Sequence, residues 1–223
     1  MSIEHTLPSD IERSSFAVIR SELASRGIAL PAREAPVILR CIHATADLDY
    51  AETLSFTKDA VSRAVAALKT GILLMTDTNM ALAGVSRPAL KALGCRAFCW
   101  MAEEEIAEEA RRLGATRAVA AMRMAAERCP EAVRAIGNAP TALLELAGQI
   151  DRGLRPALVI AVPVGFVNVV ESKETVFAAC ERAGVPCIMA RGRKGGSTVC
   201  AAICNALLYE AADMQDPSAR GWN

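Results

Sequence analysis

The pattern of hydrophobic and polar positions divides the chain near residue 70 into two parts. Over residues 9–70, apolar side chains recur at helical spacing and no strand-like run is visible. From Gly71 onward, short apolar runs alternate with amphipathic segments. Runs that are apolar on both faces are typical of strands buried in a parallel sheet. We therefore expect residues 1–223 to form one domain, with an N-terminal helical part over 9–70 and an α/β core over 71–210.

Three helices are expected in the N-terminal part. The segment SDIERSSFAVIRSELASRG combines Ser9 as a cap with Glu12 three residues later, which is the spacing of a capping box. The segment AREAPVILRCIHATAD accommodates Pro36 in its first turn, where a missing N–H costs little. The segment TKDAVSRAVAALKTG ends just before Gly71, a residue that favours helix termination.

The second part predicts a doubly wound α/β sheet. Strict alternation of strands and helices implies right-handed crossovers and helices on both faces of the sheet. The fold expected is therefore a flavodoxin-like, five-stranded parallel sheet with added N-terminal helices. The predicted strands are ILLMT (72–76), CRAFCW (95–100), AVRAIG (132–137), ALVIAVP (157–163) and PCIMAR (186–191), and the predicted helices lie near 86–93, 103–128, 140–151, 172–183 and 197–210.

Ligands of such folds bind outside the carboxyl ends of the strands. Four segments at those ends are rich in small, polar or glycine residues: TDTNM (76–80), IGNAPT (136–141), PVGFVNVVESK (163–173) and RGRKGGST (191–198). We expect the ligand to be contacted there, with Asn138, Gly165 and Arg191 among the contacting residues.

The segment RGRKGGST carries the strongest local signal, because three cations (Arg191, Arg193 and Lys194) and its glycines directly precede a helix. Glycines let backbone N–H groups approach an anion, and a helix N-terminus favours negative charge. Carboxylate or phosphate binding and a solvated turn are both compatible with it, and its order is not that of a Walker loop. Thr116 can cap a helix that starts with TRAVAAMRM, and Arg117 in its first turn opposes the helix dipole. A ligand contact and an ordinary surface position are both compatible with that arginine.

Composition narrows the class of protein. Twenty-five basic and 25 acidic residues give zero net charge, which argues against a nucleic-acid binder. The N-terminal residues MSIEHTLPSDIERS do not resemble a signal peptide, and no apolar run approaches the length of a membrane span, so a soluble cytoplasmic protein is expected. The eight cysteines form no Cys-x-x-Cys pair, so we expect reduced structural thiols and no metal site; Cys41 is the one to examine for reactivity.

The chain contains only two histidines. His5 lies in a polar N-terminal stretch, whereas His43 sits between Ile42 and Ala44, three residues after Arg40. A hydrogen-bonded core histidine and a functional imidazole are both consistent with this position. The residues alone do not decide between them.

The segments ERSSFAVIR, RCIHATAD, TDTNMALAGVSR, AIGNAPTALLEL, PVGFVNVVESKE and ARGRKGGSTVCAAICNAL occur in this order across nearly the whole chain, roughly residues 11 to 210. In sequence and spacing they resemble the precorrin-8X methylmutase family of cobalamin biosynthesis. That resemblance implies a flavodoxin-like sheet with extra N-terminal helices. It also implies an isomerase that moves a methyl group from C-11 to C-12 of a corrin precursor, giving hydrogenobyrinate or its cobalt-containing counterpart.

The resemblance further implies roles for individual residues. His43 matches the family's active-site histidine, and Arg40 matches a substrate-contacting arginine. Thr116 and Arg117 match a Thr-Arg pair that faces the substrate. Ser15 matches a substrate-contacting serine, although the adjacent Ser14 supplies a second hydroxyl, and Lys194 is given no role. A homodimer without cofactor is implied. Two other classes stay open at this point: a corrinoid carrier without activity, and a nucleotide- or phosphate-binding α/β enzyme that uses RGRKGGST.

Overall fold

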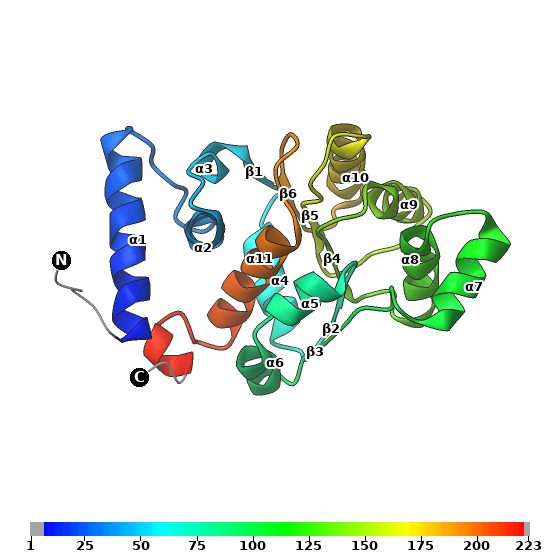
Figure 1. The fold of residues 1–223 in the computed structure, drawn as a ribbon, viewed down its shortest axis with the longest axis horizontal. Helices are drawn as coiled ribbons and strands as arrows, with labels where there is room; N and C mark the ends of the chain where they lie inside the picture. Colours follow the sequence, from blue (N-terminus) through cyan, green and yellow to red (C-terminus); the bar gives the residue numbers. More distant parts are fainter. Residues whose placement is uncertain (1–6, 221–223) are drawn as a thin grey trace.

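The computed structural model describes residues 7–220, so His5 lies outside the described part of the chain. Helices and strands alternate along most of it (Figure 1). The helices are α1 Pro8–Ser25, α2 Ala35–Thr45, α3 Tyr50–Thr53, α4 Ala60–Leu68, α5 Asn79–Gly84, α6 Arg87–Leu93, α7 Glu104–Leu113, α8 Arg117–Arg128, α9 Pro140–Asp151, α10 Val169–Ala183, α11 Ser197–Ala211 and the short 3-10 helix η1 Pro217–Arg220. The strands are β1 Leu54–Phe56, β2 Leu73–Thr76, β3 Arg96–Phe98, β4 Val133–Ile136, β5 Val159–Ala161 and β6 Cys187–Ala190.

The sheet is six-stranded and mixed, in the order β1-β6-β5-β4-β2-β3. All five predicted strands are present, and each neighbouring pair among them is parallel. The expectation of a five-stranded, purely parallel sheet is corrected by β1, which pairs antiparallel with β6 at the edge. Residues 9–70 are therefore not helical throughout, because β1 lies within them. With three residues, β1 is too short to show an alternating pattern in the sequence.

Successive residues of the strands face opposite sides of the sheet and enter two separate hydrophobic cores. In β5, Ile160 packs with α2, α4 and α11 on one side, whereas Val159 and Ala161 pack with α8, α9 and α10 on the other. The N-terminal helices α2 and α4 therefore share a core with α11. Helices on both faces were predicted, and both cores confirm them.

Two helix boundaries differ from the sequence prediction. Helix α1 begins at Pro8 with Leu7 in the cap position, because proline's fixed φ suits the first turn. Ser9 therefore lies inside the helix and is not its cap, which leaves Glu12 for other partners. The segment 103–128 is two helices, because Gly114 takes a left-handed conformation that ends α7.

Helix α1 and η1 bring the two ends of the described chain together. η1 packs against α1, and Figure 1 shows it (red) beside the start of that helix (blue). Within residues 7–220, no helix has both the length and the apolar character needed to cross a membrane.

Candidate functional site

His43 opens into a groove of about 890 Å³ between α1 and α2. The lining mixes apolar side chains with hydroxyl, imidazole and charged groups: Ile11, Ser14, Ser15, Val18, Ile19, Glu22, Arg26, Ile42, His43, Ala46, Asp47, Leu48 and Asp49. The imidazole is exposed to this groove, while its ring stacks on Phe16 of α1 with centroids 5.1 Å apart. His43 is therefore not a core histidine. One face is packed and the rest is accessible to a ligand.

The surroundings of His43 disfavour its charged form. Burial of the packed face, followed by the positive charge of Arg40, lowers the pKa of the imidazole below its ordinary value of 6.5. The Glu12 carboxylate partly opposes this, and Arg220 adds a smaller effect in the same direction as Arg40. In the free protein at neutral pH, His43 is therefore mainly neutral.

Both candidate serines line the same groove as His43. The Ser15 hydroxyl donates to the Ile11 carbonyl one turn earlier, at 2.8 Å, and so holds its side chain along the helix. That bond leaves the oxygen lone pairs of Ser15 available to a ligand donor. Since Ser14 also faces the groove, the geometry provides two hydroxyls for the role that the sequence assigned to Ser15.

Arg40 lies on the other side of α1. It lines a second groove of about 610 Å³ between α1, α2 and α11, and its Nη2 donates to Glu12 Oε1 at 3.0 Å. The guanidinium carbon lies 4.8 Å from the Phe16 ring centroid. Phe16 is thus in contact with both Arg40 and His43, and separates the arginine from the imidazole groove. Glu12, which the sequence placed in a capping box, is the ion-pair partner instead.

The glycine-rich loop after β6 reaches the rim of the His43 groove through one side chain. Lys194 Nζ donates to Asp47 Oδ2 at 2.7 Å and to Asp49 Oδ2 at 2.6 Å, and both carboxylates line that groove. Sequence reasoning gave Lys194 no role and missed the two aspartates. An acidic pair just after a helix was the available signal. Arg191 in the same loop is exposed, and its backbone N–H donates to the Thr53 carbonyl.

Gly195 lets this loop pass close to the end of β5. A Cβ atom at this position would lie 2.2 Å from the Val162 carbonyl oxygen, and its φ is +154°. No other residue fits there. Beneath the loop, the buried Lys173 donates to the Gly192 and Lys194 carbonyls at 2.9 and 2.8 Å. Burial lowers the pKa of Lys173 to about 8.

The turn after β4 is organised by Asp77, another buried charge. Its carboxylate accepts from the backbone N–H groups of Gly137, Asn138 and Ala139 at 2.7–2.8 Å. Asp77, in the segment TDTNM, is therefore a structural acceptor for this turn. Thr78 is the cap of α5, accepting from Ala81. The Asn138 side chain is exposed at this edge.

The loop after β5 carries Gly165 and a set of exposed apolar side chains. The Gly165 N–H donates to the Arg193 carbonyl, so this loop is tied to the glycine-rich loop. Phe166, Val167 and Met80 are 83, 75 and 73% exposed. The sequence suggested polar ligand contacts at these loops, whereas the structure adds an uncovered apolar surface beside them.

Thr116 and Arg117 lie elsewhere. Thr116 caps α8, as predicted, and its hydroxyl lies 3.0 Å from that of Thr141 at the start of α9. Arg117 is exposed, with one contact to the Met101 carbonyl at 3.4 Å. Figure 1 shows α8 and α2 in opposite halves of the molecule. A single copy of the chain therefore unites His43 with Ser14, Ser15 and the Lys194 loop, but does not bring Arg117 to them.

Cysteine chemistry and metal binding find no support in the described residues. All eight cysteines are free thiols. Burial raises the pKa of Cys41, the nearest to His43, far above its usual range, so its thiolate is not accessible at neutral pH. Within residues 7–220, no group of three or more histidine, cysteine or acidic side chains is placed to hold a metal ion.

Comparison with known proteins covers nearly the whole chain. The sequence profile of the precorrin-8X methylmutase family matches residues 10–210. The cobalt-precorrin-8 methylmutase of Leptospira interrogans is 39% identical over 204 residues, 89% of this chain and 92% of that protein. The precorrin-8X methylmutase of Pseudomonas aeruginosa is 40% identical over 201 residues, 90% and 94% of the two chains. The crystal structure of precorrin-8X methyl mutase from Thermus thermophilus superposes with a TM-score of 0.82 at 37% identity, covering 91% of this chain and 98% of that one.

Proposed function

The chain belongs to the precorrin-8X methylmutase family, and we propose that it performs the family's methyl shift at the groove between α1 and α2, with His43 as proton donor. It is an isomerase of cobalamin biosynthesis, and its substrate is a corrin precursor. The observation that carries the assignment of the site is the position of His43: an accessible imidazole on the wall of a groove of about 890 Å³.

Protonation of a ring nitrogen draws electron density toward it and makes migration of the methyl group easier. The methyl group moves with its bonding pair from C-11 to C-12, so no electron leaves the substrate and no second substrate is needed. His43 gives its proton to the macrocycle and recovers it after the shift. Its lowered pKa makes the imidazolium a stronger acid than free histidine, while the negative charges of the arriving substrate favour its protonated form.

In this proposal, arginines and backbone N–H groups bind the carboxylate side chains of the macrocycle. We assign this binding to Arg40, Arg117 and Arg191, since each charge-assisted contact with a carboxylate is worth about 1.5–3 kcal/mol. Ser15 or Ser14, Thr116, Asn138 and Gly165 complete the proposed contacts. The parallel strands β2, β4, β5 and β6 end at the loops that carry several of them, as ligand sites do in a flavodoxin-like, doubly wound core, which we infer for the five parallel strands.

A homodimer accounts for two features that one protomer leaves unexplained. Met80, Phe166 and Val167 are large apolar side chains exposed to solvent, and a partner surface would cover them. Helix α8, which begins at Arg117, lies in the half of the molecule away from α2, which carries His43 (Figure 1). A two-fold arrangement in which the partner's α8 faces the α1–α2 groove would meet both needs.

Mixing two impaired variants, assayed at a substrate concentration well below KM, tests this arrangement. Each His43→Ala or Arg117→Ala homodimer lacks one part of every site, whereas a heterodimer of the two contains one intact site. Activity that reappears on mixing and subunit exchange supports a site shared between copies. Sedimentation that finds only monomer at micromolar concentration contradicts the dimer.

Two separate measurements test the rival functions: thermal stabilisation tests the nucleotide-binding one, and turnover tests the carrier. The comparisons do not favour a carrier without activity. A phosphate-binding role for the glycine-rich loop is weakened by Lys194, which is already paired with Asp47 and Asp49. Corrinoids should raise the melting temperature, and mononucleotides should not. Turnover of metal-free and cobalt-loaded precursors, assayed side by side, tests the function itself and identifies which form is the substrate.

A further inference from the structure

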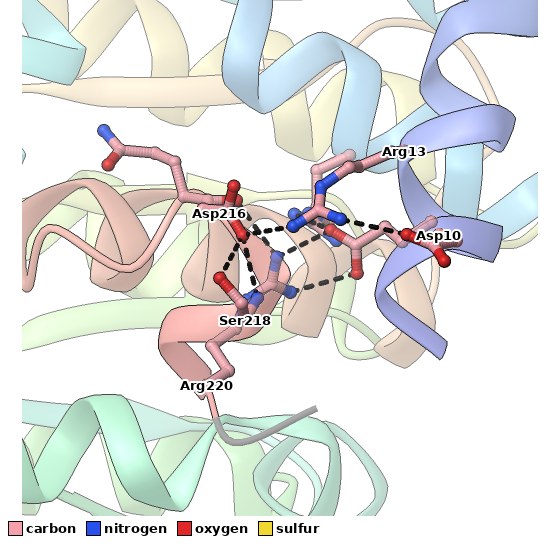
Figure 2. A network of polar contacts seen from close by, with 8 residues as sticks. Asp10, Arg13, Asp216, Ser218 and Arg220 are labelled. Carbon is pink, nitrogen blue, oxygen red and sulfur yellow. Dashed lines mark hydrogen bonds and ion pairs between the residues drawn. The ribbon is translucent and has the colours of Figure 1, made fainter. Parts of the chain in front are cut away.

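Ten residues beyond the segment matched by the family profile, the short helix η1 places an arginine in the interior of the protein. The Arg220 side chain is 2% exposed, and it donates to both carboxylate oxygens of Glu12, at 3.0 and 2.7 Å. Figure 2 shows Arg220 directed toward the turn of α1 that carries Asp10 and Arg13. Outside this pair, Asp216 binds Arg13 and Ser218, which ties the C-terminal segment to the same turn.

Glu12 is shared unequally between two arginines. Arg220 binds it through two hydrogen bonds, whereas Arg40 binds it through one, at 3.0 Å, to the oxygen that Arg220 also uses. The ring of Tyr209 lies 4.3 Å from the Arg220 guanidinium and 5.2 Å from that of Arg40. Burial alone would raise the pKa of Glu12, but the bonds from Arg220 and Arg40 outweigh it, and the pKa lies below its usual value. One carboxylate therefore faces two guanidinium groups.

Of the two arginines that bind Glu12, Arg40 is the more accessible. The Arg40 side chain is 14% exposed and lines the groove of about 610 Å³, whereas Arg220 is enclosed. If Arg40 turns toward a ligand, Glu12 keeps its two hydrogen bonds to Arg220. The buried Glu12 carboxylate is then still paired. Without Arg220, the same movement would abandon a buried carboxylate, and Glu12 would hold Arg40 in place.

We propose that Arg220 is a positioning residue that keeps Arg40 available to a carboxylate side chain of the substrate by occupying Glu12 itself. The inference rests on the proposed function, because it presupposes that Arg40 binds substrate. It adds a C-terminal residue outside the matched family segment to the binding apparatus, and it explains why two arginines converge on a single glutamate.

The test compares Arg220→Gln with the double variant Glu12→Gln/Arg220→Gln, using hydrogenobyrinic acid as the binding probe and a corrin precursor for turnover. In Arg220→Gln, Glu12 and Arg40 pair with each other, so the Kd of the probe and KM should rise about 10-fold, while kcat at saturation changes by less than about twofold. The double variant removes the Glu12 carboxylate together with Arg220, so Glu12 no longer holds Arg40 and Arg40 is again available to the probe. Its Kd should return close to that of the unmodified protein.

Asp10→Asn is the matched control, because Asp10 pairs with Arg13 on the same turn of α1 through an exposed ion pair. It should leave Kd and KM unchanged. A merely structural role of Arg220 would lower the melting temperature of both glutamine variants without recovery of affinity in the double variant. That result, or normal affinity in folded Arg220→Gln, overturns the inference.

If Arg220→Gln does not fold, Arg220→Lys takes its place. A lysine keeps the charge but cannot bind both carboxylate oxygens in the same plane, so Kd should rise less, by a few-fold. Unchanged Kd in folded Arg220→Lys counts equally against the idea. Arg40→Gln separates this inference from the function beneath it: if that variant binds the probe normally, the Arg40 contact itself is wrong. If it binds weakly while Arg220→Gln binds normally, only the role of Arg220 is wrong.

Discussion

The loops at the carboxyl end of the sheet and the groove between α1 and α2 are held in shape in different ways. At the sheet, buried charges bind the backbone: Asp77 accepts from three consecutive N–H groups, and Lys173 donates to two loop carbonyls. Around α1 and α2, side chains bind side chains, as in the Glu12–Arg220 pair beside the second groove and in the bridge from Lys194 to Asp47 at the rim of the His43 groove.

This difference predicts where each region is sensitive to substitution. A loop fixed by its own backbone keeps its path when exposed side chains change, so substitutions there should alter binding without altering structure. The groove depends on a few ion pairs between segments far apart in the chain. Changes to those pairs should alter the positions of catalytic and binding groups together. The following variants test that contrast.

The largest effect is expected from His43→Ala in the groove. A general acid contributes about 10²–10⁴-fold to rate, so isomerisation should fall by that factor. The imidazole is exposed and stacks only on Phe16, so the melting temperature should change little and the coloured product complex should persist. His43→Asn, which cannot donate a proton of suitable acidity, should fail similarly. Normal turnover in folded His43→Ala would remove the proposed mechanism.

At the sheet, Asp77→Ala should act on stability and not on chemistry. Its removal leaves the buried Gly137 N–H without an acceptor, at a cost of about 1–3 kcal/mol. Water can partly replace the acceptor of the part-buried Asn138 and Ala139 N–H groups, so the free energy of unfolding should fall by roughly 2–4 kcal/mol. Asp151→Ala, which breaks an exposed pair with Arg182, is the control and should change stability by less than about 0.5 kcal/mol. Denaturant unfolding measures both. Equal losses in the two variants would contradict a special role for the buried carboxylate.

Much of the fold was predictable because its signals are local. Pro140 at the first turn of α9 and Pro36 at that of α2 mark helix starts in the sequence itself, and both helices are where they were predicted. The short strand β1 was missed, since three residues carry no period and only pairing with β6 makes them a strand. The predicted cap at Ser9 was wrong, because the helix begins at Pro8 and Leu7 is in the cap position.

The groove was predictable only in part, for the same physical reason. His43 and the serines were identified from their motifs, and they lie together. Their ion-pair surroundings were not: Glu12 meets Arg220 across 208 positions, and Lys194 meets Asp47 across 147. Periodicity describes which face of a segment is buried but not which distant segment covers it.

Replacing Arg117 with Ala tests whether the exposed arginine at α8 binds substrate. If it pairs with a substrate carboxylate, affinity for the corrinoid should weaken by about 1.5–3 kcal/mol, with no change in unfolding midpoint. Arg112→Ala is the control, because Arg112 is an exposed arginine on α7 that pairs with Glu109. Calorimetric titration distinguishes them. Equal affinity in the two variants would exclude Arg117 as a carboxylate contact.

A smaller effect is expected from Lys194→Ala. The Lys194 side chain links the two regions, because it extends from the loop after β6 to Asp47 and Asp49 at the groove. Loss of the lysine leaves Asp47 and Asp49 as unpaired negative charges at the groove that receives a polyanion. KM should rise by a few-fold, more strongly at low ionic strength, whereas kcat should hold because His43 is untouched. Lys194→Arg should restore KM. Neutralising the rim with Asp47→Asn/Asp49→Asn in the Lys194→Ala background should also restore it if repulsion is the cause. An unchanged KM at low salt would contradict the repulsion.

The finest test follows the pKa of His43 through the pH dependence of kcat/KM. If the imidazolium is the acid, kcat/KM is highest where free His43 is protonated and falls as pH rises through a pKa that lies below 6.5. Arg40 lowers that pKa and Glu12 raises it, so the two neighbours act in opposite directions. In Arg40→Gln the alkaline decline should move to higher pH, because a positive charge has been removed. In Glu12→Gln it should move to lower pH, because a negative charge has been removed. Movement in the same direction in both variants, or none in either, would show that the titrating group is not His43.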